Sequence, residues 1–261
     1  MTYYHASFRE NLAELHHFAF LYCGDREDAV RYLERLADHC IGMESGWPGR
    51  DVLFASLARE IEESLGRKAA TTFAILDNIL RSDITRPINF DAPEIQGDET
   101  RIPVLLWELK RTCLTRVLGC LPPSVRVAML LVDLHNYTPT RAAEILGIKE
   151  SALRVRLTRA RKRVEDFLAP RCQHYNVKNP CRCETRLGIA IDAKFVSMPP
   201  HDRDTPQEPH DADPGFHDAV ALLRSLPQVK LSTADMWSLL ERLDDTSADE
   251  RAEASEAVEI P

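Results

Sequence analysis

Apolar residues recur at helical spacing along most of the chain. From Tyr4 to Cys40 they fall every three or four positions, in two runs that Gly24-Asp25 separates. Asp25 is of the residue type that caps helix starts, so a second helix is predicted to begin there. The same spacing predicts further helices that begin near Asp51, Thr71 and Pro103.

Residues 121–168 contain the clearest helix start and stop signals. Ser124 is expected to cap one helix, Thr138 to cap a short second one, and Gly147 to end that second helix in a left-handed conformation. A longer helix begins within three residues of the glycine. A short helix, a tight turn and a longer helix predict a helix-turn-helix.

The whole pattern predicts an all-α protein, because strand-like alternation is scarce and the chain has only ten glycines. Five segments are expected: a helical domain at 1–85, an acidic linker at 86–100, a helix-turn-helix domain at 101–170, a segment rich in Cys and His at 171–191, and an acidic, partly flexible extension at 192–261.

The extension is expected to contain two short amphipathic helices. Ser232 is the predicted cap of the second, whose apolar face is expected to hold Trp237, Leu240 and Leu243. Two interpretations stay open. The pair forms a small hairpin folded onto the body of the protein, or it is an acidic arm that competes with DNA for the basic helix.

Positive charge is concentrated in one part of a chain whose net charge is -8. Residues 121–171 carry ten Lys and Arg against five Asp and Glu, whereas residues 192–261 carry six against sixteen. The predicted helix at 150–163 has an apolar seam of Leu153, Leu157, Ala160 and Val164. A basic island between acidic flanks predicts contact with a polyanion, and the alternative is a solvated basic face.

In a helix-turn-helix, the N-terminal half of the second helix approaches the bases. Arg154 and Arg156 are therefore the expected base contacts, joined at the helix start by Lys149, Glu150 and Ser151. Phosphate contacts are expected from the cations further along, which are Arg159, Arg161, Lys162 and Arg163.

Four soft ligands lie in one stretch of twelve residues after the basic helix: Cys172, His174, Cys181 and Cys183. Such a set suits tetrahedral zinc, although the i,i+2 spacing is tighter than that of usual zinc motifs. The alternative is reduced thiols and a surface histidine. The seven cysteines of the chain are expected to be cytosolic thiols, since no export signal is evident.

Other function classes find little support in the sequence. No apolar run approaches the roughly 18 residues that a membrane span needs. No phosphate-binding G-x-x-x-x-G-K-[ST] and no G-x-S-x-G nucleophile motif is present, so we expect no catalysis. A cytoplasmic protein without a membrane partner is predicted.

Three stretches together resemble the sigma-70 family in its extracytoplasmic-function (ECF) form: "LPPSVRVAMLLVDL", "AAEILGI" and "LRVRLTRARKRV". They are similar to region 4, which implies recognition of the minus-thirty-five promoter element. Val155 stands where a serine is common in the family, which implies an apolar contact such as that with a thymine methyl group.

The stretch "FRENLAELHHFAFLYCGDREDAVRYLERL" is similar to region 2. The resemblance implies core RNA polymerase and promoter DNA as partners, and an anti-sigma factor as a further one. For strand separation, Trp47 and Phe54 are the aromatic candidates. The alternatives are a DNA-binding regulator that does not melt promoters and a mimic that captures an anti-sigma factor.

Overall fold

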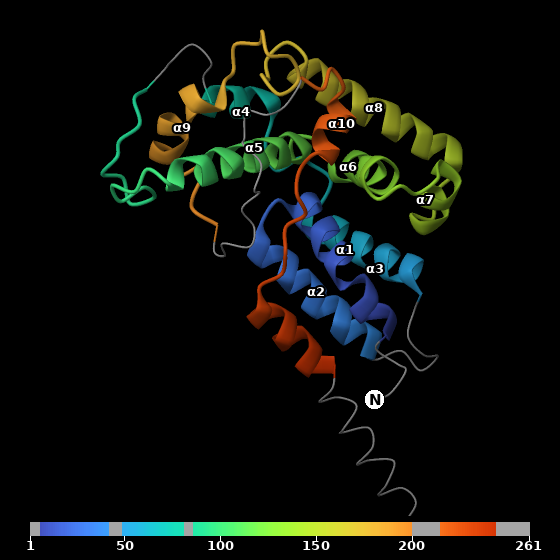
Figure 1. The fold of residues 1–261 in the computed structure, drawn as a ribbon. Coiled ribbons are helices and arrows are strands. Elements are labelled where there is room, and N and C mark those ends of the chain that lie inside the picture. Colours follow the sequence, from blue (N-terminus) through green and yellow to red (C-terminus); the bar gives the residue numbers. More distant parts are fainter. Residues whose placement is uncertain (1–5, 42–48, 81–85, 200–214, 244–261) are drawn as a thin grey trace, which may run out of the picture. The chain divides into compact units, whose positions relative to one another are not determined.

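The computed structural model of the chain describes residues 6–41, 49–80, 86–199 and 215–243. The regular elements in these ranges are helices, and the strand-like pairing in them is limited to one backbone bridge between Cys172 and Cys181. The predicted all-α fold is confirmed (Figure 1). No helix in these four ranges combines the length and the apolar character that a membrane span requires.

The helices are α1 (Ala6–Cys23), α2 (Arg26–Ile41), α3 (Arg50–Leu65), α4 (Phe73–Leu80), α5 (Arg101–Gly119), α6 (Pro123–Met129), the π-helical turn η2 (Leu130–Leu134), α7 (Pro139–Ile145), α8 (Glu150–Leu168), α9 (Cys183–Asp192) and α10 (Ala219–Arg224). Residues 233–243 are also helical. Contacts divide the chain into two compact units, one from Met1–Ser64 with Val229–Pro261 and one from Leu65–Gln228.

The first unit is built on α1, α2 and α3. Phe18 of α1 makes edge-to-face contacts with Tyr22 and with Phe54 of α3, at ring-centroid separations of 5.7 and 5.2 Å. Asp25 caps α2 as predicted, because its carboxylate accepts a 3.0 Å hydrogen bond from the Asp28 amide. The contact between Phe18 and Phe54 packs α1 against α3.

Phe54 is fully buried in this core, so its predicted place on a DNA-melting surface is wrong. Trp47, the other candidate, lies outside the described residues. Other aromatic side chains of α1 and α2 are buried as well: Phe8, Phe18, Phe20, Tyr22 and Tyr32. In α1–α3, hydrophobic packing therefore takes up the rings that stacking on bases would need.

The C-terminal segment from Val229 belongs to the same unit. The ring Nδ1 of buried His16 lies 3.2 Å from the Val229 carbonyl oxygen, and Arg242 forms a 2.9 Å ion pair with Asp38 of α2. The first contact ties the start of this segment to α1, and the ion pair places the helix at 233–243 beside α2 (Figure 1).

The helix at 233–243 is capped by Ser232, as predicted, since its hydroxyl accepts a 2.9 Å hydrogen bond from the Asp235 amide. Its buried stripe is Leu239 and Leu243, whereas Trp237 is 57% exposed. The predicted face is therefore wrong for Trp237, which lies about 160° around the helix from the buried Leu239. Of the two interpretations left open for this pair of helices, the hairpin is wrong, because α10 belongs to the second unit, where it contacts α8 and η2, whereas the helix at 233–243 belongs to the first.

In the second unit, α5 contacts α4, α6 and α9. The helix α5 begins at Arg101, two residues before the proline expected to open it. Residues 86–100, predicted as a linker, form a series of turns with Ala92 and Ile95 buried. Gly188 of α9 meets the start of this segment, where a Cβ atom would lie 2.8 Å from the Pro87 carbonyl oxygen.

Candidate functional site

The turn between α7 and α8 has the caps that the sequence predicts. Thr138 precedes α7 and its hydroxyl accepts a 3.2 Å hydrogen bond from the Arg141 amide. Gly147 has a φ of +62°, and the Ile148 amide returns to the Ala143 carbonyl oxygen at 3.0 Å. This glycine-ended cap turns the chain sharply into α8.

The expected cap at Ser124 is wrong. The helix α6 begins one residue earlier, at Pro123, after an extended Pro122, and the residue before it makes no side-chain cap. Proline in the first turn needs no amide partner, which favours this earlier start.

The second helix of the motif, α8, buries the predicted seam of Leu153, Leu157, Ala160 and Val164. Helical geometry at about 100° per residue places the opposite face around Ser151, Val155 and Lys162. The structure exposes all three, and Val155 is 50% exposed. The centre of the exposed face therefore has small side chains, Ser151 and Val155, in the N-terminal half of α8 and a cation, Lys162, in its C-terminal half.

At the start of α8, Glu150 holds two neighbours in place. Its carboxylate accepts 2.8 Å hydrogen bonds from the Thr140 hydroxyl and from the Arg154 Nε. The bonds from Arg154 and then from Thr140 lower the pKa of Glu150. This contact links the first turn of α7 to the first turn of α8 and fixes the direction of Arg154.

Arg161 has a partner inside the protein. Its guanidinium donates two hydrogen bonds to the Asp133 carboxylate, from Nε at 3.0 Å and from Nη2 at 2.6 Å. Hydrogen bonding to Asp133, whose side chain is 4% exposed, raises the pKa of Arg161. Arg224 of α10 donates to the Asp133 carbonyl oxygen. This bidentate pair ties α8 to the end of η2.

The remaining predicted DNA contacts are distributed around α8. Lys149 precedes the helix and is exposed, and Arg156 is half-buried with a guanidinium nitrogen 3.5 Å from the Ser124 carbonyl oxygen. Lys162 forms a 3.1 Å ion pair with Asp166 one turn later. Arg159 and Arg163 are exposed.

Arg163 also borders an open hollow of about 750 Å³ in the second unit. Arg67, Lys68 and Arg171 line the same hollow. Sequence reasoning missed Arg67 and Lys68 because they lie more than 80 positions before α8. The positive surface around α8 therefore includes cations from before α4.

These positions suit contact with a nucleic acid duplex. A strip of Ser151 and Val155 at the centre, with cations on either side, matches a helix that presents small side chains to base edges while its flanks meet phosphates. The exposed side chain of Val155 can make an apolar contact with the methyl group of a thymine.

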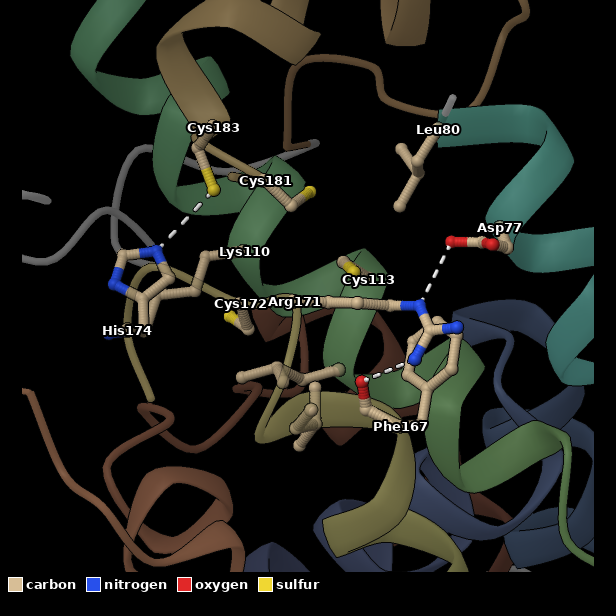
Figure 2. Close-up of a pocket in the computed structure, with 12 residues that line it drawn as sticks. Asp77, Leu80, Lys110, Cys113, Phe167, Arg171, Cys172, His174, Cys181 and Cys183 are labelled. Atoms are coloured by element: carbon tan, nitrogen blue, oxygen red, sulfur yellow. Dashed lines mark hydrogen bonds and ion pairs between the residues drawn. The ribbon is translucent and has the colours of Figure 1, made fainter. Parts of the chain in front are cut away.

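The predicted metal ligands come together around a second site (Figure 2). Cys172, His174, Cys181 and Cys183 line one cavity of about 40 Å³, and Cys113 of α5 lines it too. His174 Nε2 lies 3.4 Å from Cys183 Sγ. Sequence reasoning missed Cys113, which is 59 positions before Cys172, and no local signal connects the two.

Backbone hydrogen bonds hold the cysteine segment in place. The Gln173 amide donates to the Cys181 carbonyl oxygen at 3.1 Å, and the Cys181 amide donates to the Arg171 carbonyl oxygen at 3.0 Å. Asn179 Nδ2 bridges the Ala169 and Cys172 carbonyl oxygens at 2.7 and 3.0 Å. The loop between Cys172 and Cys181 is thus closed on itself beside the end of α8.

Burial raises the pKa of the Cys181 thiol to about 11, and it also raises the pKa values of the Cys113 and Cys183 thiols well above their usual range. For all three, the largest electrostatic contribution after burial is that of Cys172. In the orientations seen, no three His, Cys, Asp or Glu side chains of the described chain converge closely enough to hold a metal ion.

A comparison with known families identifies part of the second unit. Residues 111–164 match the family model described as Sigma-70, region 4. The match runs from the middle of α5 to the last turns of α8 and includes the helix-turn-helix, and it covers less than half of the chain. Searches of curated proteins and of solved structures gave no match.

Proposed function

We propose that the chain is a sigma factor of the ECF type, which binds core RNA polymerase and directs it to promoter DNA through α7 and α8. The observation that supports this most strongly is the coincidence of the region 4 match with a helix whose seam is buried and whose opposite face is exposed between cations. The proposed role is binding and positioning, without catalysis.

In this proposal α8 lies in the major groove of the minus-thirty-five element. Ser151 and Val155 face the base edges, with Arg154 and Arg156 beside them. Arg159, Lys162 and Arg163 contact phosphates, since they are exposed along the flanks and the C-terminal half of the helix. The exposed ion pairs of Arg154 and Lys162 are weak enough in water to exchange for DNA.

A second candidate is a DNA-binding regulator with the same helix-turn-helix and no promoter-melting activity. The burial of Phe54 and of the other described aromatic side chains in α1–α3 favours it. Stacking of separated bases needs exposed rings, and each stacked base contributes about 1–3 kcal/mol.

Run-off transcription with core RNA polymerase separates the two candidates. A binding site is first selected from random duplexes with the full chain, and it is then placed upstream of a reporter template. Permanganate reactivity of unpaired thymines measures strand opening. The sigma factor proposal expects core-dependent transcripts and opening, which Val155→Asp abolishes and Lys178→Ala, an exposed cation outside α8, leaves unchanged.

Binding of the selected duplex without opening or transcripts would instead support the regulator. Absence of sequence-selective binding by the full chain, with or without core polymerase, would refute both candidates.

A further inference from the structure

The cavity between α5, the end of α8 and α9 is the site with unexplained chemistry (Figure 2). Four thiols line it, and they come from three segments: Cys113 from α5, Cys172 and Cys181 from the closed loop, and Cys183 from the first residue of α9. The cavity volume is about 40 Å³. This is room for one ion, and it is far below the roughly 300–1,000 Å³ of a small-molecule pocket.

The arrangement of the thiols indicates which of them belong together. The thiols of Cys113, Cys172, Cys181 and Cys183 line the same small cavity, and their sulfur atoms lie around it (Figure 2). His174 is buried, and its Nε2 is 3.4 Å from Cys183 Sγ, which suits a ring N–H that donates to the sulfur. Metal-bound thiolates commonly receive such hydrogen bonds from neighbouring groups.

We propose that Cys113, Cys172, Cys181 and Cys183 bind one Zn²⁺ ion as a tetrahedral set of four thiolates, with His174 as a hydrogen-bond donor to Cys183. Four thiolates are a soft ligand set that favours zinc over magnesium or calcium. This ligand set differs from the one that the sequence suggests, because Cys113 takes the place of His174.

Binding requires small movements and the loss of protons. The thiols must turn about their Cα–Cβ bonds toward the cavity, since no three of the candidate side chains in the described chain are already converged. Each thiol releases one proton to solvent and donates an electron pair to the metal, so the complete site carries a charge of about -2. Lys110, which is buried and lines the same cavity, supplies a positive charge beside it.

The bound ion would connect α5, the end of α8 and the start of α9. These elements carry the region 4 match and the segment that follows it. The proposed site is of the structural class of zinc sites, because protein ligands fill all four coordination positions of the ion.

The test uses the full chain, purified under reducing conditions without chelator, and Zn²⁺ competition with a chromophoric chelator. We expect one zinc per chain. Cys113→Ser should weaken binding by more than about 100-fold, and Cys120→Ser, which removes a thiol seven positions later at the end of the same helix, should not. His174→Asn should cost about 10–100-fold, the usual effect of a neighbour of a metal ligand.

A second measurement does not depend on the folding of any variant. Alkylation of the wild-type chain, mapped by mass spectrometry, should show that Zn²⁺ protects Cys113, Cys172, Cys181 and Cys183 and leaves Cys23 unaffected. Equal alkylation of Cys113 with and without Zn²⁺ would overturn the ligand set, as would a Cys113→Ser chain that keeps wild-type affinity. A wild-type chain that binds no zinc would overturn the site itself.

Discussion

Arg161 offers the sharpest test of which α8 cations serve the fold and which serve DNA. The sequence predicts that Arg161 contacts a DNA phosphate, whereas in the structure its guanidinium donates two hydrogen bonds to the buried Asp133 carboxylate. Arg161→Ala would leave that carboxylate buried and without its cation. Removal of one partner from a fully buried pair costs about 3–5 kcal/mol.

The loss in the free energy of unfolding expected for Arg161→Ala is smaller than this, because the Arg161 side chain is 51% exposed and water reaches the ion pair. We expect Arg161→Ala to lower the free energy of unfolding by about 2 kcal/mol. Asp133→Asn keeps an acceptor for Arg161 and should cost about 1 kcal/mol. The double variant should cost about 1 kcal/mol less than the sum, since Arg161 has no charge to neutralise once Asn replaces Asp133.

The assay combines urea unfolding of the full chain with DNA binding over several salt concentrations. Each phosphate contact contributes about 0.9 to the slope of log K against log salt. The account expects Arg161→Ala to keep the wild-type slope, whereas Arg159→Ala should reduce it by about one. Unchanged stability together with a reduced slope in Arg161→Ala would refute the structural role and restore the phosphate assignment.

Four further changes have defined outcomes. Arg154→Ala should reduce the difference in binding free energy between the preferred base pair and the other base pairs at one position of the selected site by about 1–3 kcal/mol, measured by competition with single-base variants. Gly147→Ala should destabilise the second unit by about 1–2 kcal/mol, because alanine resists the φ of +62° although the space is open, and thermal unfolding measures this. Gly188→Ala should cost about 1–3 kcal/mol in the same assay, since its Cβ meets backbone oxygens that must move. The pKa of Glu150 is lowered in the folded protein, so ionised Glu150 stabilises the fold at neutral pH, and this stabilisation is lost as the pH falls below about 4.5. Glu150→Gln should remove this loss of stability at acid pH, which a titration of the free energy of unfolding against pH measures.

Local signals predicted local features well. The caps at Asp25, Thr138 and Gly147 depend on a few neighbouring residues, and all three are confirmed. The buried seam of α8 was predictable because one helical period decides it. The all-α fold followed from the same periodicity.

Features that depend on distant contacts were not predictable from one sequence. Nothing near Arg161 in the chain indicates Asp133, which is 28 positions away, and Cys113 joins the cysteine cavity only through the packing of α5. Trp237 lies at the edge of the apolar face of its helix, and only the tertiary packing decides that Leu239 and Leu243 are buried while Trp237 is exposed. Phe54 likewise gives no local sign of whether it faces a core or a partner.

We propose that α8 recognises a specific DNA sequence through the face opposite its buried seam. The most direct measurement is the affinity of the full chain for its selected duplex and for a scrambled one, over several salt concentrations, with Val155→Asp and Lys178→Ala alongside wild type. The account predicts tighter binding to the selected duplex by at least about 10³-fold, loss of that preference in Val155→Asp, and no change in Lys178→Ala. Equal affinity of the wild-type chain for both duplexes, or an unchanged preference in Val155→Asp, would contradict it.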